Sequence, residues 1–325
     1  MKTATKVLII VAVALVVLGI AGTVTSVYFL GEEIFKSATG EKKIETVTVN
    51  EEFDSISVVA DGADVELKKS DDGGCRAVFT NISDPEFSAA VADGVLKVGA
   101  KDGRKWYERI RLFWGKEQKI EIYLPKESYS RLNIDAATGD VKTARELSFE
   151  TVNIDASTGS VSFPSAVNGL LKIKLSTGDI KIDGVNTGSL DLTASTGDVT
   201  LNKVGCEGDV KIRLSTGSVL ASDVTCKNLV STGSTGDVIL KNVISLAAFD
   251  LKRSTGDILF DGCDAAEITL KTSTGDVTGT LLSEKIFFTE TSTGDVRVPK
   301  SLTGGKCEIK TSTGDIILGL KDKTE

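Results

Sequence analysis

A row of carboxylates at fixed spacing is the feature of this sequence with the clearest capacity for chemistry. Thr-Gly steps recur every 19 or 20 residues, and Asp follows the Gly in eight of ten steps: Asp140, Asp179, Asp198, Asp237, Asp257, Asp276, Asp295 and Asp315. Stacked carboxylates could share Ca²⁺ ions, or they could accept hydrogen bonds from backbone N–H groups at turns. Ser160 and Ser218 replace Asp in the other two steps, and a hydroxyl caps a turn better than it binds a metal ion. We therefore predict turn capping, with Ca²⁺ as the alternative and no other cofactor or metal.

Two of the five cysteines are placed so that they could react with each other. Cys206 and Cys226 each lie nine residues after a repeated Gly, so they occupy the same position in successive repeats. Neighbouring β-strands are about 4.8 Å apart, which is within the range that a disulfide requires. A disulfide and a stacked pair of free thiols both fit this spacing. Cys263 and Cys307 occupy apolar positions of the repeat, where we expect buried thiols, and Cys75 has no partner in this frame.

Residues 101–119 combine basic and aromatic side chains within an acidic protein. This segment, KDGRKWYERIRLFWGKEQK, has seven Lys or Arg against three acids and contains both tryptophans of the chain. Such a mixture suits an anionic envelope glycopolymer, lipid headgroups or another envelope protein. The alternative is a hairpin that covers the first coil. The candidate binding residues are Arg104, Lys105, Trp106, Tyr107, Arg109, Arg111 and Trp114.

The composition argues against most enzymes. The chain has no histidine, so it lacks the commonest general base and the most frequent zinc ligand. Its net charge of −8 disfavours nucleic acid as a partner.

The elements that carry these residues follow from the repeat. The residue two places after each Thr-Gly glycine is always Val or Ile, and the residue seven places before it is always apolar. This alternation indicates one strand before each turn and one after it. A unit this short cannot bury its own apolar face, so we predict a single-chain parallel β-solenoid of about ten coils over residues 131–318, each coil stacked on the one before it. The predicted corner glycines are Gly139, Gly159, Gly178, Gly197, Gly217, Gly236, Gly256, Gly275, Gly294 and Gly314.

The flanking regions complete the predicted organisation. Residues 46–130 are an irregular β region that caps the first coil, and residues 319–325 are a polar tail. Residues 7–30 contain no charged side chain, and 24 residues of helix span roughly 36 Å, which is enough to cross a bilayer. Lys2 and Lys6 precede this segment, so we predict a single-pass membrane protein with residues 1–6 in the cytoplasm, a linker at 31–45 and the remainder outside the cell. A cleaved signal peptide is the competing interpretation.

The Ser-Thr-Gly-Asp repeats from Thr138 to Ile316 resemble those of the bacterial DUF4097-type adhesin family. The segments FDSISVVADGADVEL (53–67), DGVLKV (93–98) and IEIYLPK (120–126) add to this resemblance. The resemblance implies a β-solenoid in the cell envelope, often behind one membrane segment, and it implies no reaction.

Three classes of function remain. The first is a non-enzymatic, adhesin-like binding or scaffold module anchored at the cell surface. The second is a self-assembling stalk whose open C-terminal coil, ending near Leu318, pairs with another chain. The third and weakest is a polysaccharide-active β-helix enzyme, because coils of nearly constant length leave no loops to form a cleft.

Overall fold

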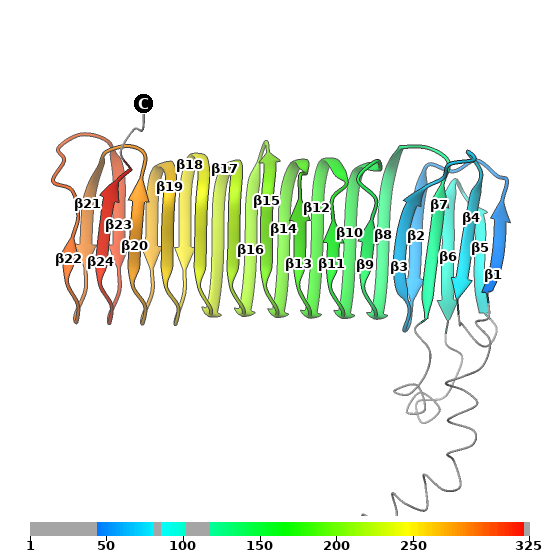
Figure 1. The fold of residues 1–325 in the computed structure, drawn as a ribbon, viewed down its shortest axis with the longest axis horizontal. Helices are drawn as coiled ribbons and strands as arrows, with labels where there is room; N and C mark the ends of the chain where they lie inside the picture. The colour runs from blue at the N-terminus through cyan, green and yellow to red at the C-terminus, as the bar shows by residue number, and fades with distance from the viewer. Residues whose placement is uncertain (1–43, 81–85, 102–117, 322–325) are drawn as a thin grey trace, which may run out of the picture. The chain divides into compact units, whose positions relative to one another are not determined.

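The computed structural model describes residues 44–80, 86–101 and 118–321, which form an all-β structure (Figure 1). The N-terminal strands are β1 (Ile44–Val49), β2 (Ser55–Ala60), β3 (Asp64–Lys69), β4 (Cys75–Thr80), β5 (Glu86–Ala92), β6 (Val95–Lys101) and β7 (Lys119–Leu124). The next strands are β8 (Ser128–Thr138), β9 (Val141–Thr143), β10 (Ser148–Thr158), β11 (Val161–Phe163), β12 (Ala166–Thr177), β13 (Ile180–Asp183), β14 (Asn186–Thr196), β15 (Val199–Cys206) and β16 (Asp209–Thr216). The last are β17 (Val219–Thr235), β18 (Val238–Lys252), β19 (Ile258–Lys271), β20 (Val277–Leu281), β21 (Lys285–Glu290), β22 (Val296–Arg297), β23 (Gly305–Lys310) and β24 (Ile316–Leu320).

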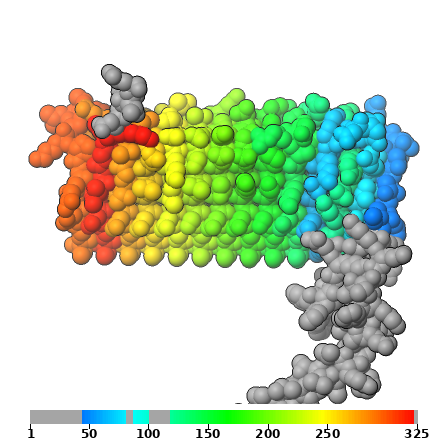
Figure 2. Space-filling view, in the orientation of Figure 1, coloured from blue at the N-terminus to red at the C-terminus, as the bar shows by residue number. Residues whose placement is uncertain are grey.

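Each regular coil has two arms that meet at a Thr-Gly corner, and we name each coil by its corner glycine. In the Gly178 coil, β12 leads into the corner and β13 leaves it. β12 pairs in parallel with β10 and β14, and β13 pairs in parallel with β11 and β15. Figure 2 shows the coils as evenly spaced ridges. The predicted parallel β-solenoid is confirmed.

The core is a set of stacked apolar rows between the two arms. Strand alternation turns every second side chain inward, so the same repeat positions are buried in coil after coil. Two residues after the corner glycine, the Val or Ile is 0–1% exposed in nine coils, and only Val296 differs, at 43%. The aromatic rings of Tyr129, Phe149 and Phe163 also form a row inside, with neighbouring centroids 6.2 and 6.3 Å apart.

The N-terminal end is closed by strands of the chain itself. The Gly62 coil, made of β2 and β3, stacks in parallel on β8 and β9. β6 and β7 stack on its other side, so the first coil of the sequence lies between two later ones. Beyond them, β5 pairs antiparallel with β6, β4 with β7, and β1 with β4. The predicted cap therefore consists of strands that join the outermost arms of a parallel stack through antiparallel pairing.

At the C-terminal end, the last two coils are in reversed order. β23 of the Gly314 coil pairs in parallel with β19 on one side and β21 on the other, so Cys307 lies opposite both Ile268 and Phe287. β24 lies between β20 and β22 in the same way (Figure 1). The prediction that every coil stacks on its predecessor is wrong here. The terminal coil is the Gly294 coil, not the one that ends near Leu318. Both coils carry the same Thr-Gly-Asp corner with Val or Ile two places after the Gly, so the corner pattern does not fix their order.

The chain bypasses one coil position after β20, and polar contacts fix this crossover. Lys285 is almost fully buried, and its Nζ lies 2.7 Å from Oδ1 of Asp264 and 2.6 Å from Oγ of Ser283. On the returning segment, the hydroxyls of Ser301 and Thr303 donate hydrogen bonds to the carboxylate of Glu284. This Ser-Lys-Asp group therefore holds the chain path at the crossover.

The predicted transmembrane helix at residues 7–30 lies outside the described residues, as do residues 1–6 and 31–43. Within the described part of the chain, no helix is long and apolar enough to cross a membrane.

Candidate functional site

The corner glycines are required by the close stacking of the coils. Gly178 has φ of +136°, which L-residues rarely adopt, and a Cβ atom there would lie 2.0 Å from the carbonyl oxygen of Gly159. The φ values of the ten corners run from 122° to 147°, beyond the usual left-handed helical region, so the clash with the neighbouring coil excludes any side chain.

The Asp row makes contacts with backbone N–H groups at the corners. Oδ1 of every Asp in the row except the terminal Asp295 accepts a hydrogen bond from the backbone N–H of the corresponding residue in the next coil along the stack, at 2.7–2.9 Å. The row begins at Asp64 of the Gly62 coil and ends at Asp295. Where Ser160 or Ser218 is the acceptor, the distance lengthens to 3.4 or 3.3 Å. These contacts use the carboxylates as backbone caps.

The described residues contain no group of three or more Asp, Glu, Cys or His side chains that could hold a metal ion. The Asp row is one carboxylate wide, and every member except Asp295 is already engaged with a backbone N–H group. The alternative role of the row in Ca²⁺ binding gains no support from this arrangement.

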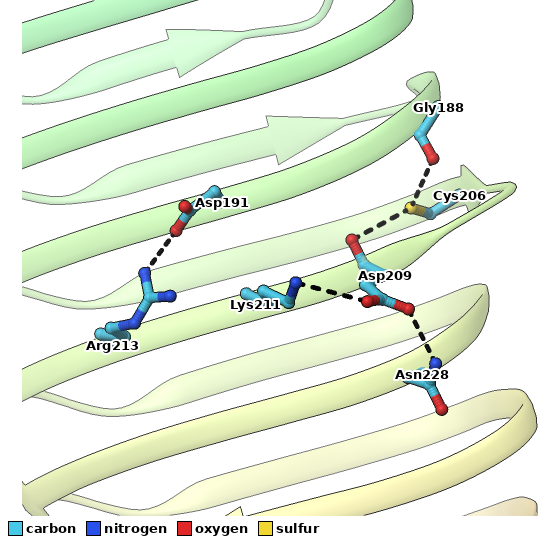
Figure 3. Close-up of polar contacts among 7 residues, drawn as sticks. All are labelled: Gly188, Asp191, Cys206, Asp209, Lys211, Arg213 and Asn228. Atoms are coloured by element: carbon cyan, nitrogen blue, oxygen red, sulfur yellow. Dashed lines mark hydrogen bonds and ion pairs between the residues drawn. The ribbon is translucent and has the colours of Figure 1, made fainter.

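Cys206 and Cys226 occupy equivalent positions in neighbouring coils, as the spacing predicts. The register of β15 and β17 pairs Val204 with Val224 and Gly205 with Thr225, which places the two cysteines next to each other. Both thiols are buried and free. Sγ of Cys206 lies 3.7 Å from the carbonyl oxygens of Gly188 and Asp209 (Figure 3). Burial raises the pKa of both thiols, to about 12 for Cys226, which keeps them protonated and slow to react.

The other three cysteines are also buried and free. Burial raises the pKa of Cys263, that of Cys75 to about 11 and that of Cys307 to about 12. Cys263 and Cys307 are 0% exposed, so they pack as apolar side chains, as predicted.

The candidate binding residues from Arg104 to Trp114 lie outside the described residues, but the structure places both flanks of their segment. Lys101 ends β6 and Lys119 begins β7, which are the two arms of the outermost coil. The segment therefore stands in the chain where the other coils have a Thr-Gly-Asp corner. The registers of β1, β4 and β7 place both Ile44 and Lys119 opposite Thr80. The chain from the N-terminus and the basic segment thus join the solenoid at the same place, within about 10 Å, or two strand spacings.

Four charged side chains of alternating sign lie beside this junction, on β3 and β7. Nζ of Lys68 lies 2.6 Å from the carboxylate of Glu121 and 3.3 Å from that of Glu66, and Lys119 contacts the same two acids. Burial alone would raise the pKa of Glu66 and of Glu121, but hydrogen bonds from the two lysines bring both below the usual 4.5. Hydrogen bonds to these acids raise the pKa values of Lys68 and Lys119. The group is electrically balanced and stiffens the outermost coil.

An aromatic ring with cations on it adjoins this network. The guanidinium of Arg76 lies 4.1 Å from the ring centroid of Tyr123, and Nζ of Lys68 lies 5.6 Å from it. Basic side chains of β3 and β4 therefore gather around the ring of Tyr123 on β7.

Sequence reasoning did not identify one buried cation, Arg253. Its side chain is 4% exposed in the middle of the stack, Nη2 donates to Oγ of Ser231 at 2.9 Å, and Nε has no partner. Burial lowers its pKa to about 10. The sequence did contain an indication of this buried cation, because Ser231 and Gly233 break the apolar pattern of the preceding coil. In the structure, a Cβ on Gly233 would lie 3.0 Å from Nη1 of Arg253.

Comparisons with known proteins agree with this geometry. A family model described as Toastrack DUF4097 matches residues 53–213 and 206–325. A solved structure described as a "putative adhesin" from Parabacteroides distasonis is 13% identical, with a TM-score of 0.51, over 85% of this chain and 98% of its own. A second structure from that organism, described as a "putative lipid binding protein", is 18% identical, with a TM-score of 0.45, over 75% of this chain and 96% of its own. No curated protein matches the sequence. At these identities, the first structural likeness supports the fold alone.

Proposed function

Because the chain belongs to the Toastrack DUF4097 family, we propose that it is a non-enzymatic binding module of the bacterial cell surface, anchored in the membrane by residues 7–30. We further propose that residues 104–114 bind anionic groups, meaning phosphates or carboxylates carried by lipid headgroups or by an envelope polymer. The solved adhesin-like structure supports a surface role only by its fold.

The observation that carries this proposal is the shared position of Ile44 and Lys119 opposite Thr80. Residues 31–43 span at most about 45 Å when fully extended, because each residue adds no more than about 3.5 Å. A helix at residues 7–30 would therefore keep the basic segment near the membrane surface. Anionic lipid attracts Lys and Arg at about 1 kcal/mol per residue in that zone, and tryptophan favours the same interface.

The regular coils argue against the enzyme alternative. From β8 to β24, the longest connection between consecutive strands is the seven-residue return from β22 to β23, so the arms present flat sheet faces rather than a walled cleft. The Asp row, which would be the obvious source of catalytic carboxylates, is occupied by backbone N–H groups.

Tryptophan fluorescence tests the proposal directly, because Trp106 and Trp114 are the only tryptophans of the chain. The full-length chain is reconstituted in neutral phosphatidylcholine vesicles, in vesicles that also contain phosphatidylglycerol, and in neutral vesicles with added poly(glycerol phosphate). We expect a blue shift and weaker acrylamide quenching in one or both anionic samples. The lipid and polymer samples distinguish the two sources of phosphate.

Matched variants assign the effect to the segment. Arg104→Ala, Arg109→Ala and Arg111→Ala together remove three cations but keep both tryptophans, and should abolish the shift. The control replaces three exposed lysines of the middle coils, Lys227, Lys241 and Lys271, by Ala and should leave it intact. An equal loss in both variants, or no shift with either anion, contradicts the proposal.

A further inference from the structure

The Gly294 coil exposes inward side chains that the same positions bury in the other coils. Val296 is 43% exposed, whereas its counterparts in the other nine coils are 0–1% exposed. The inward Phe287 is half-buried, whereas the same position is buried in the other nine coils. On the outward face of β21, Phe288 and Ile286 are 54% and 37% exposed. The end of the core is therefore open to solvent at this coil.

The backbone rows that join the coils also stop here. In every other regular coil, the N–H of the corner glycine donates to a Thr carbonyl in the next coil, as in Gly275 to Thr313 and Gly314 to Thr293, both at 2.9 Å. No described residue accepts a hydrogen bond from the N–H of Gly294. The row of Asp caps likewise ends at Asp295, whose carboxylate pairs with Arg297 of the same arm, at 2.9 Å. The edge of β21 and β22 thus offers donors and acceptors for one more pair of strands.

The other end of the solenoid shows how this chain covers such an edge. There, β4 and β5 pair antiparallel with the outermost arms. These strands also prevent the Gly294 coil of another molecule from stacking on that end. A two-fold axis perpendicular to the length of the solenoid, however, lays each arm of a Gly294 coil antiparallel beside the same arm of a second copy. We propose that two copies of this chain dock in this way, with one Gly294 coil against the other.

Charge and size favour a second copy over other occupants. Residues 282–300 contain three acids, Glu284, Glu290 and Asp295, and three bases, Lys285, Arg297 and Lys300, so they are neutral in a chain of net charge −8. Two such ends do not repel each other, because neither has a net charge. For the same reason, the coil does not attract a charged polymer. The 19 residues of this coil approach the roughly 20–30 residues that a stable interface uses on each side.

This docking does not depend on the function proposed above, but it adds to it. In the pair, the two N-terminal ends point away from each other. If residues 7–30 anchor the chain, the pair joins two surfaces, so the adhesin-like role would include binding between identical molecules on facing membranes.

Sedimentation of the full-length chain in detergent tests the docking itself. Between about 1 and 100 µM, the protein mass should rise from that of one chain to that of two, a range typical of micromolar dimers. Over the same range, hydrogen exchange of peptides covering 285–297 should slow, while peptides around Leu246 should not change. A single-chain mass throughout, or protection elsewhere without protection at 285–297, overturns the proposal.

Substitutions at the open end locate the contact. Val296→Lys brings two like charges together in the pair and should prevent the doubling of mass. Thr289→Lys, at a half-buried inward position of β21, provides a second variant if the first unfolds, as checked by circular dichroism. Leu246→Lys is the matched control, because Leu246 is an apolar residue 76% exposed in the middle of the solenoid. A dimer that survives both end variants, or that only the control abolishes, contradicts docking through the Gly294 coil. The fluorescence experiment above fails or succeeds independently of this one.

Discussion

The two ends of the solenoid solve the same problem in different ways. At the N-terminal end, β1, β4 and β5 run antiparallel across the stack, and the inward side chains of the outermost coil, such as Ile120 and Ile122, are 0% exposed. At the C-terminal end, no described strand covers β21 or β22, and the inward Val296 is 43% exposed. A repeat protein needs an end that differs from its repeats, and this chain provides one at only one side of its described structure.

The two ends also share one feature of their coil order. At each end, the first or last coil of the sequence is inserted between two other coils, so it has neighbours on both sides. The outermost position is left to a coil from further inside the sequence. The difference between the ends is therefore the presence of a cap, not the order of the coils, and the following predictions test that distinction.

The largest effect is expected from a side chain at an interior corner. In Gly178→Val, the added Cβ would lie 2.0 Å from the carbonyl oxygen of Gly159. Neither neighbouring coil can move to relieve this clash. We expect a loss of more than about 4 kcal/mol in the free energy of unfolding, measured by urea titration. Gly294→Val meets the carbonyl of Gly314 at 2.1 Å, but the terminal coil can shift outward, so its cost should be less than half. Equal costs would show that the terminal coil is held as firmly as the interior.

Core truncations at the two ends should differ next. Phe79, in cap strand β4, is 2% exposed and packs against Phe87, with ring centroids 4.7 Å apart and the rings tilted by 34°. Phe79→Ala should cost about 3–5 kcal/mol because it leaves a closed cavity. Phe287→Ala, at a half-buried position of the terminal coil, should cost about 1–2 kcal/mol because water already reaches that site. Thermal and urea unfolding of both variants, at a concentration that keeps the chain monomeric, provides the comparison. A larger cost at Phe287 would mean that the terminal coil is covered.

A smaller effect, of opposite sign, is expected from the buried cation. Arg253→Met removes a charge that has no carboxylate partner among the described residues and keeps most of the side-chain volume. We expect a gain of about 1–3 kcal/mol in unfolding free energy, because an unpaired buried charge is costly. Thr291 occupies the same repeat position in the terminal coil and is half-buried, so Thr291→Met should change stability by less than about 0.5 kcal/mol. If Arg253→Met is destabilising, the guanidinium holds its coil in place through its bond to Ser231.

The smallest effect concerns the pH dependence of the capped end. The pKa values of Glu66 and Glu121 lie below 4.5 in the folded state, so their ion pairs stabilise fully above about pH 4.5 and lose this contribution as the pH falls through the folded values. The pKa values of Lys68 and Lys119 are raised, so the same contribution is also lost when the pH rises above about 10.5. The paired substitution Glu66→Gln and Glu121→Gln should cost about 1 kcal/mol at pH 7 and nothing near pH 3. If the cost stays constant between pH 7 and pH 3, the ion pairs do not contribute to the stability of the capped end.

Much of the fold follows from the sequence because the residues of each repeat determine its local geometry. The Gly fixes the corner, the Asp caps the next coil, and the inward Val or Ile marks the core, so one unit predicts the next. The order of the Gly294 and Gly314 coils does not follow, because exchanging them leaves every one of these local rules satisfied. Two features of the sequence indicated this order weakly. Thr289 occupies a core position, and the seven-residue return between β22 and β23 fits a terminal coil better than an interior one.

The candidate site is predictable to a different degree. The turn caps and the buried thiols follow from periodicity, because each position inherits its environment from its copies. The meeting of Ile44 and Lys119 at Thr80 depends on the antiparallel strands β1 and β4, which have no repeat to reveal their partners. The binding residues from Arg104 to Trp114 remain a prediction, because they lie outside the described residues.

The inserted Gly314 coil has a mechanical consequence. A strand at the edge of a sheet can be peeled away one hydrogen bond at a time, but β23 and β24 are bonded on both sides. A pulling force applied at the C-terminus must break two ladders at once before the chain can lengthen. The Gly314 coil should therefore resist such a force better than a strand at the edge of the sheet would.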